Sequence, residues 1–115
     1  ADARGALAAY EQAVLRALED TGNALVLNAR TREEDAWLSR AADDAGAAAR
    51  LARLRFDAGA ASLLEVLDAE RTRLQAEDAL AEARTRHVVS SVQVFRALAG
   101  GWPDRTPART PIPGR

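Results

Sequence analysis

Apolar residues recur along the first half of the chain at intervals that keep them on one face of an α-helix. Spacings of seven and four separate Leu7, Val14, Leu18 and Leu25. Further on, steps of three and four alternate between five small or aliphatic residues: Leu38, Ala41, Ala45, Ala48 and Ala52. This spacing is typical of the contact line of a coiled coil. With no proline in residues 3–57, the pattern predicts one long helix or two nearly continuous ones, with a local bend or a change of packing partners where Gly22 and Asn23 interrupt it.

A second run of apolar residues has a strict period of seven, at Leu67, Leu74, Ala81, Val88 and Phe95. It predicts a second helix over about residues 63–99, with that row as a seam toward a neighbouring helix. Additional valines widen the apolar stripe from Val88 to Leu98. One neighbouring helix covers the first part of this helix, whereas the last part needs several neighbours.

Between the two helices lies the segment RFDAGAASLLEVLDAER, residues 55–71. Gly59 stands where a left-handed residue closes a helix, and Arg53 and Arg55 lie in the last turn, near the negative end of the helix dipole. Ser62 and Glu65 form the S-x-x-E pattern of a capping box, which begins the next helix. These signals predict an antiparallel hairpin of two helices with a tip at about residues 58–62.

The tip carries more apolar residues than a turn needs. Leu63, Leu64, Val66 and Leu67 surround the first turn of the second helix and cannot all face the first helix. Some of them must therefore contact another chain or another segment. Asp68 has two interpretations on spacing alone: an acid favoured by the helix dipole and paired on the surface with Arg71, or part of a functional site at the tip.

Composition excludes several classes of protein. The chain has 115 residues, of which 28 are alanine, so it builds helix readily but buries little surface. There is no cysteine, and the 16 basic residues, all arginine, alternate with 17 acidic ones for a net charge of -1. A disulfide framework is therefore excluded, and nucleic-acid binding has little support. No apolar run has the roughly 20 residues of a membrane-spanning helix.

Enzymatic chemistry and metal or cofactor binding also find no support in the residues. His87 is the only histidine, so a surface or contact-line role is favoured over metal binding. His87 and Ser91 are four residues apart, but no third group is present to orient them as a base and a nucleophile. Trp37 is interpreted as a residue of the helical bundle rather than an interface anchor, and Trp102 as the closing residue of the second helix. An enzyme dependent on His87 remains the least supported alternative.

At this point the residues resemble a known family, the TolC and NodT-like outer-membrane channels of tripartite efflux and type I secretion. The resemblance rests on YEQAVLRALED near the start and on the segment from RFDAGAASLLEVLDAER to ALAGGW. It covers about residues 2–102 and implies the second-repeat periplasmic hairpin of a homotrimer that combines a β-barrel with a helical tunnel. The first repeat, the barrel strands and the lipidated cysteine of lipoprotein members have no counterpart here.

The resemblance implies roles for the tip residues. Leu64, Glu65 and Asp68 correspond to positions that constrict the periplasmic entrance of such channels. The loop that meets a periplasmic adaptor protein corresponds to Gly59, Ala60, Ala61, Ser62 and Leu63. The implied function is efflux of small molecules across the outer membrane, with the adaptor connecting the channel to an inner-membrane pump, and no catalysis.

Two further expectations concern the chain as a whole. Residues 103–115, PDRTPARTPIPGR, are rich in proline and predict a disordered tail. The chain begins at Ala1 without methionine, which indicates either processing or an excerpt from a longer protein. The alternative function is a free-standing coiled-coil module for oligomerisation or adaptor binding.

Overall fold

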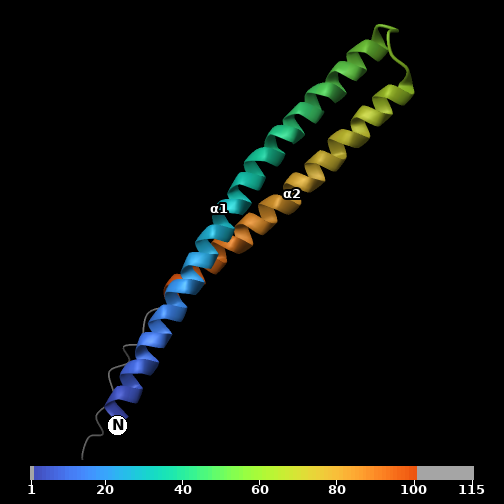
Figure 1. The fold of residues 1–115 in the computed structure, drawn as a ribbon. Coiled ribbons are helices and arrows are strands. Elements are labelled where there is room, and N and C mark those ends of the chain that lie inside the picture. The colour runs from blue at the N-terminus through green and yellow to red at the C-terminus, as the bar shows by residue number, and fades with distance from the viewer. Residues whose placement is uncertain (1, 101–115) are drawn as a thin grey trace, which may run out of the picture.

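Two long helices make up the part of the protein that its structure, a computed structural model, describes: residues 2–100. Helix α1 spans Asp2–Asp57 and helix α2 spans Leu63–Gly100. The helices run antiparallel and are joined at one end by a short loop (Figure 1). The predicted all-α antiparallel hairpin is confirmed. Residues 101–115, including Trp102 and the proline-rich tail expected over 103–115, lie outside the described residues.

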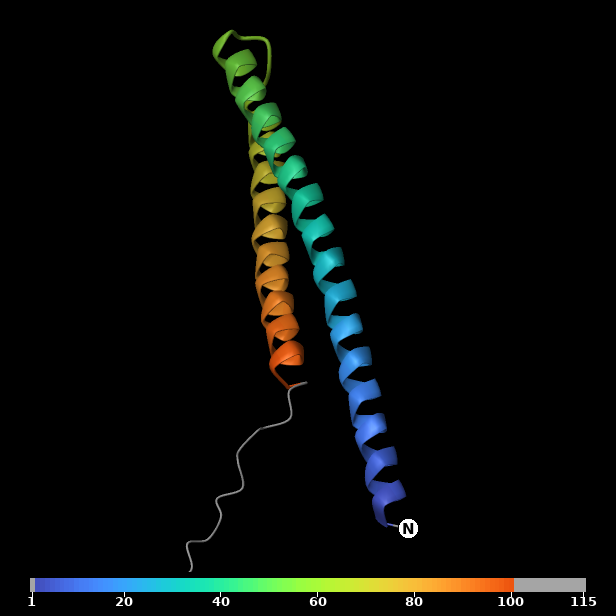
Figure 2. The ribbon, with the colours of Figure 1, turned by 90° about the vertical axis from the view of Figure 1, so that its left-hand side faces the viewer.

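Helix α1 is much longer than its partner. Its 56 residues extend about 84 Å at 1.5 Å per residue. Helix α2 has 38 residues and its end lies beside residues 9–17 of α1, so only the first turns of α1 extend beyond it without a partner in the hairpin (Figure 2). Helix α1 continues without interruption through Gly22 and Asn23. The bend predicted there therefore does not break the helix.

The two helices meet along a regular coiled-coil seam, which we define as the buried or partly buried positions that recur in steps of three and four. On α1 these positions are Ala17, Thr21, Ala24, Asn28, Thr31, Asp35, Leu38, Ala42, Ala45, Ala49 and Ala52. On α2 they are Val66, Ala69, Arg73, Ala76, Leu80, Ala83, His87, Ser90, Val94 and Ala97. Alternating steps of three and four are the signature of a coiled coil. Most members are small, which allows the helix axes to approach closely.

The apolar row expected to form a seam of α2 does not face α1. The row Leu67, Leu74, Ala81, Val88 and Phe95 lies one residue after the seam in each heptad and is exposed: Leu74 is 52% exposed and Phe95 is 73% exposed. A residue next to a seam position is rotated by about 100° around the helix axis, away from the partner helix. The period of seven was correctly recognised, but it belongs to a second apolar row outside the hairpin.

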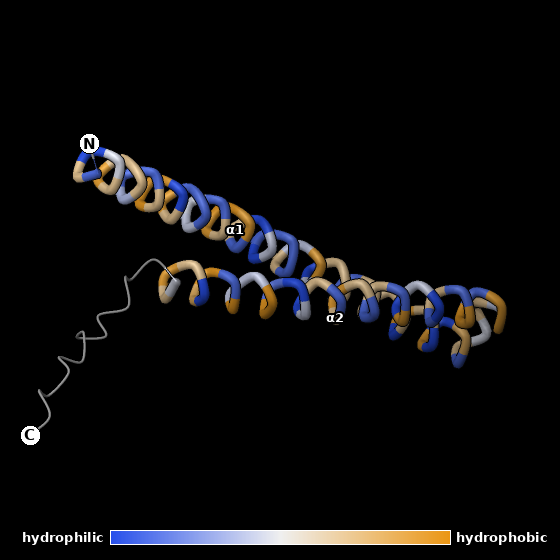
Figure 3. Tube along the Cα trace, turned by 90° about the horizontal axis from the view of Figure 1, so that it is seen from below, coloured by the Kyte–Doolittle hydropathy of each residue, from blue (hydrophilic) through white to orange (hydrophobic). Residues whose placement is uncertain are grey.

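The apolar row expected along α1 faces α2 only in part of its second half. Leu7, Val14, Leu18 and Leu25 are exposed. Of the later set, Leu38, Ala45 and Ala52 lie in the seam, Ala41 is partly buried beside it, and Ala48 is exposed. Mainly small residues occupy the seam, because a row of leucines would increase the distance between the helix axes. Most of the large aliphatic residues therefore lie on the outer surface of the hairpin. Orange apolar positions accordingly recur along the outer surface of both helices (Figure 3).

Polar side chains form one layer of the seam. The hydroxyl of Thr31 lies 2.8 Å from Ser90 Oγ and 3.0 Å from His87 Nδ1. The amide of Asn28 donates to Ser90 Oγ at 3.1 Å and to Ser91 Oγ at 2.9 Å. Thr31 and Ser90 are buried, and burial of polar groups is tolerated only when they are hydrogen-bonded. This polar layer therefore ties α1 to α2 at a fixed level.

Ion pairs connect the helices on both sides of the seam. Arg86 Nη2 lies 2.6 Å from Glu34 Oε1, and Arg84 Nε lies 3.5 Å from Asp35 Oδ1. Nearer the tip, Glu70 accepts from Arg53 Nη2 at 2.6 Å and from Arg73 Nε at 2.7 Å. A hydrogen bond from Arg73, together with the positive charge of Arg53, holds the pKa of Glu70 below its ordinary value.

Candidate functional site: the hairpin tip

The end of α1 is closed by three backbone hydrogen bonds around Gly59. Ala58 N donates to Leu54 O at 3.0 Å, Gly59 N to Phe56 O at 2.9 Å, and Ala60 N to Arg55 O at 2.7 Å. Gly59 has φ +75°, a left-handed conformation that side chains disfavour. The last two bonds and the positive φ form a Schellman motif. The predicted role of Gly59 in ending the helix is thus confirmed.

The start of α2 is capped by Ser62, whose Oγ accepts from Glu65 N at 3.3 Å. This is one half of the predicted capping box. The reciprocal bond from Ser62 N to the Glu65 carboxylate is absent from residues 2–100. The Glu65 side chain is instead exposed, so it is free to face a partner.

The basic residues at the end of α1 have separate roles. Arg55 Nη2 donates to Ala60 O at 3.4 Å and supports the loop from outside. Arg53, which the sequence placed beside Arg55 at the helix end, instead pairs with Glu70 across the seam. The two helices are therefore held together a few turns behind the loop, and the loop itself stays uncovered.

Most of the apolar residues of the tip point away from α1. Only Val66 is buried in the seam. Leu63, Leu64 and Leu67 are exposed, with Leu64 reaching 75%. This agrees with the expectation that these four side chains cannot all face the first helix. A row of exposed leucines at the end of a hairpin indicates a surface that other chains cover.

Acidic groups accompany these leucines. Glu65 and Asp68 are both exposed on the first turns of α2. Asp68 accepts a hydrogen bond from Thr72 Oγ1 at its backbone carbonyl, but among the described residues its carboxylate makes no ion pair, with Arg71 or any other residue. The surface pair between Asp68 and Arg71 is therefore not formed. The tip thus presents exposed carboxylates next to exposed leucines, without a basic group to neutralise Asp68.

The tip and the rest of the described chain offer no metal site. Residues 2–100 contain no group of three or more histidine, cysteine or acidic residues that could hold a metal ion. Ser90 and Ser91 donate to the backbone carbonyl of His87, at 2.8 and 2.9 Å, and not to its ring. His87 therefore serves the polar layer and does not act as a base toward either serine.

Sequence reasoning missed two features of the seam: the polar layer and the Glu70 ion pairs. Trp37 is 64% exposed on α1, so its place in a bundle of more than these two helices stays a prediction. The spacing of Asn28 and Thr31, three residues apart and in register with the alanines that follow, was the available signal for the polar layer.

No helix within the described range has the length and apolarity to cross a membrane.

Comparison with known proteins gives a consistent assignment. A model of the family described as outer membrane efflux protein matches residues 1–100. The chain is 34% identical over 103 residues to the pyoverdine export outer membrane protein OpmQ of Pseudomonas putida, which covers 90% of this chain and 22% of that protein.

Two further relatives cover a similar region. The outer membrane protein OprJ of Pseudomonas aeruginosa is 34% identical over 97 residues, covering 84% of this chain and 20% of that protein. The cation efflux system protein CusC of Escherichia coli O6:H1 is 30% identical over 93 residues, covering 81% of this chain and 20% of that protein. This chain thus spans about a fifth of the length of these relatives. No solved structure matches it significantly.

Proposed function

Because this chain belongs to the family of outer membrane efflux proteins, we propose that it forms a periplasmic helical hairpin of a trimeric channel that exports small molecules. The family consists of transport proteins, not enzymes, and membership assigns the full-length protein to the outer membrane. Relatives are named for export of pyoverdine and for cation efflux.

The observation that supports a tunnel is the second apolar row. Leu67, Leu74, Val88 and Phe95 lie on the outside of the hairpin and are more than half exposed. An isolated two-helix hairpin has no use for a heptad row on its outer surface, because exposed apolar area of this length promotes aggregation. A neighbouring helix packed on this row buries it. Helix α2 then has two seams, one toward α1 and one toward a helix of another repeat or subunit.

The tip supplies the channel entrance in this proposal. Around a three-fold axis, three copies of Leu64 narrow the opening and three copies of Glu65 and Asp68 form acidic rings. Close carboxylates around an axis attract cations and repel one another. Apolar contact between the leucines therefore closes the entrance, whereas repulsion between the carboxylates favours its opening. Small movements of the tip change which of these two effects is larger.

The loop contacts a periplasmic adaptor protein in the same proposal. Gly59, Ala60, Ala61, Ser62 and Leu63 stand at the far end of the hairpin, and only Ala61 among them is partly buried. The small side chains of residues 59–62 leave the loop backbone accessible to a partner. Adaptor binding to the loop can move Leu64 directly, because Leu64 follows the loop in the sequence. An inner-membrane pump then acts on the channel through the adaptor.

Single-channel conductance of the full-length protein in a lipid bilayer tests the gate. We expect Leu64→Ala combined with Asp68→Ala to raise the closed-state conductance by about two- to threefold, because two shorter side chains in each of three subunits widen the constriction and this outweighs the loss of acidic repulsion. The matched control is Thr85→Ala, an exposed residue of α2 far from the tip.

Two outcomes would contradict this assignment. Unchanged conductance in the double variant removes Leu64 and Asp68 from the gate. A full-length protein that forms no ion-conducting channel at all overturns the channel itself and leaves a coiled-coil module as the function.

A further inference from the structure

The seam positions of α1 continue toward its N-terminus past the end of α2. Steps of three and four lead back from Ala17 to Val14, Tyr10 and Leu7. These three residues, which we call the seam extension, therefore lie on the side of α1 that faces α2 further along the helix. Leu7 is 58% exposed, Tyr10 62% and Val14 40%. Helix α2 thus leaves the seam extension largely uncovered.

The residues of the seam extension are larger than those that follow them in the seam. The next three seam positions of α1 hold only alanine and threonine, at Ala17, Thr21 and Ala24. Small residues therefore occupy the turns where α2 lies close, and large apolar residues occupy the turns where it ends. An extended chain is thinner than a helix, and large side chains on α1 fill the space that such a partner leaves.

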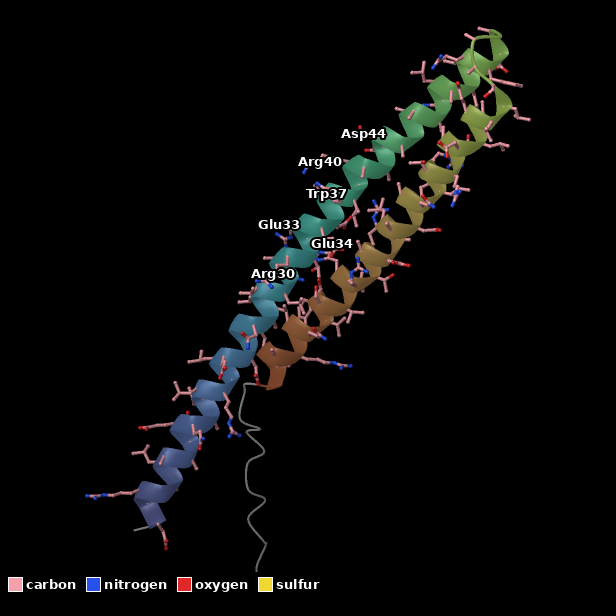
Figure 4. The ribbon with its side chains drawn as sticks, turned by 45° about the vertical axis from the view of Figure 1, so that its right-hand side comes forward. Arg30, Glu33, Glu34, Trp37, Arg40 and Asp44 are labelled. Carbon is pink, nitrogen blue, oxygen red and sulfur yellow. The ribbon has the colours of Figure 1, made fainter. Side chains whose placement is uncertain are left out.

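The seam extension differs from the other exposed apolar residues of α1 in the direction it faces. Trp37 lies on the side of α1 opposite α2, whereas the nearby Glu34 is directed toward α2 (Figure 4). A partner for Trp37 has to come from outside the hairpin. The seam extension is instead in line with α2, so the segment that follows α2 in the sequence is placed to cover it.

A surface groove connects the end of α2 to the first turns of α1. It begins beside Gly100 and runs along α1 between Ala17 and Ala9. A second depression is lined by Tyr10 and Val14 themselves. A chain that leaves α2 at Gly100 thus enters the groove directly and meets the seam extension without crossing another part of the hairpin.

The segment after α2 has the length to reach the whole seam extension. Residues 101–115 follow Gly100 and lie outside the described residues. Because the helices run antiparallel, α2 points toward the first turns of α1. The distance from Ala17 to Leu7 is about 15 Å at 1.5 Å per residue of helix. About five extended residues at roughly 3.1 Å each cover that distance.

The sequence of this segment suits an extended chain on an apolar surface. Pro103 cannot continue a helix and disfavours helical backbone at Trp102. Prolines recur every four residues as far as Pro111, which favours polyproline II, a conformation that loses little entropy on binding. Segments of this kind bind grooves that contain aromatic side chains, and Tyr10 supplies one.

The charges of the two segments are also complementary. Residues 2–20 contain four acidic and two basic side chains, a net charge of -2, and residues 101–115 contain one aspartate and three arginines, a net charge of +2. Within the part of the chain that the structure describes, no charged residue of 2–20 makes an ion pair. Attraction between the two segments therefore favours their contact.

We propose that residues 101–107 bind in an extended conformation along the seam extension, with Trp102 packed against Val14 and Tyr10. The segment takes the place of α2 as the partner of α1 in these turns. The indole supplies the apolar centre of the contact. Since the segment is tethered to α2, its effective concentration at the groove is high and a weak contact is sufficient. The contact fixes the end of α2 to α1 at the end of the hairpin opposite the tip.

This contact is separate from the proposed channel. It forms within one chain and uses neither the tip nor the outer apolar row of α2. Its failure leaves the conductance expected for the Leu64 and Asp68 variants unchanged, and a full-length protein that does not conduct leaves the contact unaffected.

Disulfide formation in the full-length protein, in outer membranes under mild oxidation, tests the proposal. We expect Leu7→Cys with Asp104→Cys to form a disulfide within one chain about tenfold faster than Gly5→Cys with Asp104→Cys, because a disulfide needs close Cα atoms. Gly5 is exposed and, two residues before Leu7, is turned by about 200° around the helix axis. Single-cysteine variants give the background from any cysteine elsewhere in the protein.

Substitutions in the Leu7→Cys and Asp104→Cys protein identify what holds the segment. We expect Trp102→Ala to slow disulfide formation about fivefold, because the apolar centre is lost, and Trp102→Phe to stay within about twofold. Val14→Asp is expected to slow it as Trp102→Ala does, since the contact then buries a carboxylate. The matched control is Val26→Asp, at an exposed valine of α1 beside the paired part of the hairpin.

Three outcomes would overturn the proposal. Equal rates for the Leu7 and Gly5 pairs mean that the segment does not follow the seam extension. Equal effects of Val14→Asp and Val26→Asp, or no effect of Trp102→Ala, remove the apolar contact. Disulfides that join two chains, recognised by their doubled mass, assign the groove to the segment of another subunit.

Discussion

Thr31 is the residue on which the polar layer of the seam depends. Its hydroxyl lies within hydrogen-bond distance of Ser90 Oγ, His87 Nδ1 and the Asn28 carbonyl. Two of the three buried apolar residues of the seam are alanines, which contribute little apolar burial. Each hydrogen bond at this level is therefore a considerable part of what joins α1 to α2.

We expect Thr31→Val to lower the free energy of unfolding by about 1–2 kcal/mol, because it keeps the shape of the side chain but removes a partner of buried Ser90 and of His87. Urea unfolding measures this loss of unfolding free energy. The slope of the free energy against urea concentration is expected to stay unchanged. Thr85→Val, which alters an exposed threonine bonded only to the Ala81 carbonyl, is expected to stay within about 0.5 kcal/mol of the unaltered chain. Equal effects of the two changes would contradict a special role for the polar layer.

At the scale of the helices, Glu70 provides a cross-helix tie that depends on pH. Its hydrogen bond from Arg73 and its pairing with Arg53 lower the pKa of this carboxyl below 4.5, its ordinary value. A lowered carboxyl pKa contributes stability that is present above the unfolded value and is lost as the pH falls through the folded value. The tie is therefore complete at neutral pH and disappears in the acidic range below 4.5.

Thermal unfolding of the chain between pH 7 and pH 3 checks this tie. We expect Glu70→Gln to melt below the unaltered chain at pH 7 and the difference to shrink as the pH falls below 4.5. The effect is small because the group is near the surface. Glu77→Gln is the control, because Glu77 pairs only with Arg73 of its own helix. A difference that stays constant across the range would exclude ionisation of Glu70 as its cause.

At the scale of the whole molecule, the hairpin buries too little to be firmly stable alone. Its buried apolar residues within the described range are Ala49, Val66 and Ala83, whereas many leucines, valines and aromatic residues are exposed. Stability that comes from association increases with protein concentration. The isolated chain is therefore expected to depend on self-association for much of its helicity.

We expect the melting temperature of the isolated chain, followed by circular dichroism, to rise by several degrees between about 5 and 500 µM. Leu74→Gln, which alters the outer row without touching the seam, is expected to reduce this concentration dependence. Leu80→Gln alters the seam itself and is expected to lower the melting temperature at every concentration. A melting temperature independent of concentration would show that the hairpin is stable as a monomer.

The sequence by itself determined the two helices, their direction and the turn between them. These depend on local physics: alanine and leucine favour helix, Gly59 permits the left-handed residue that ends α1, and Ser62 supplies the hydrogen bond that begins α2. The sequence also showed that the leucines at the tip exceed what one partner helix can cover. The tip residues that the resemblance assigns to the gate and the adaptor remain a proposal.

Only the tertiary structure decided which row of residues faces which neighbour. Helix α2 carries two rows with the same period of seven, the seam and the outer apolar row. The outer row was the stronger signal in the sequence because its side chains are larger: Leu67, Leu74, Val88 and Phe95. The helices instead pack through Ala83, Ser90 and the other seam residues, because small side chains allow close approach and the polar layer satisfies its hydrogen bonds only across that face. Periodicity gives the spacing of a contact line, whereas its direction depends on the partner that the folded chain brings against it.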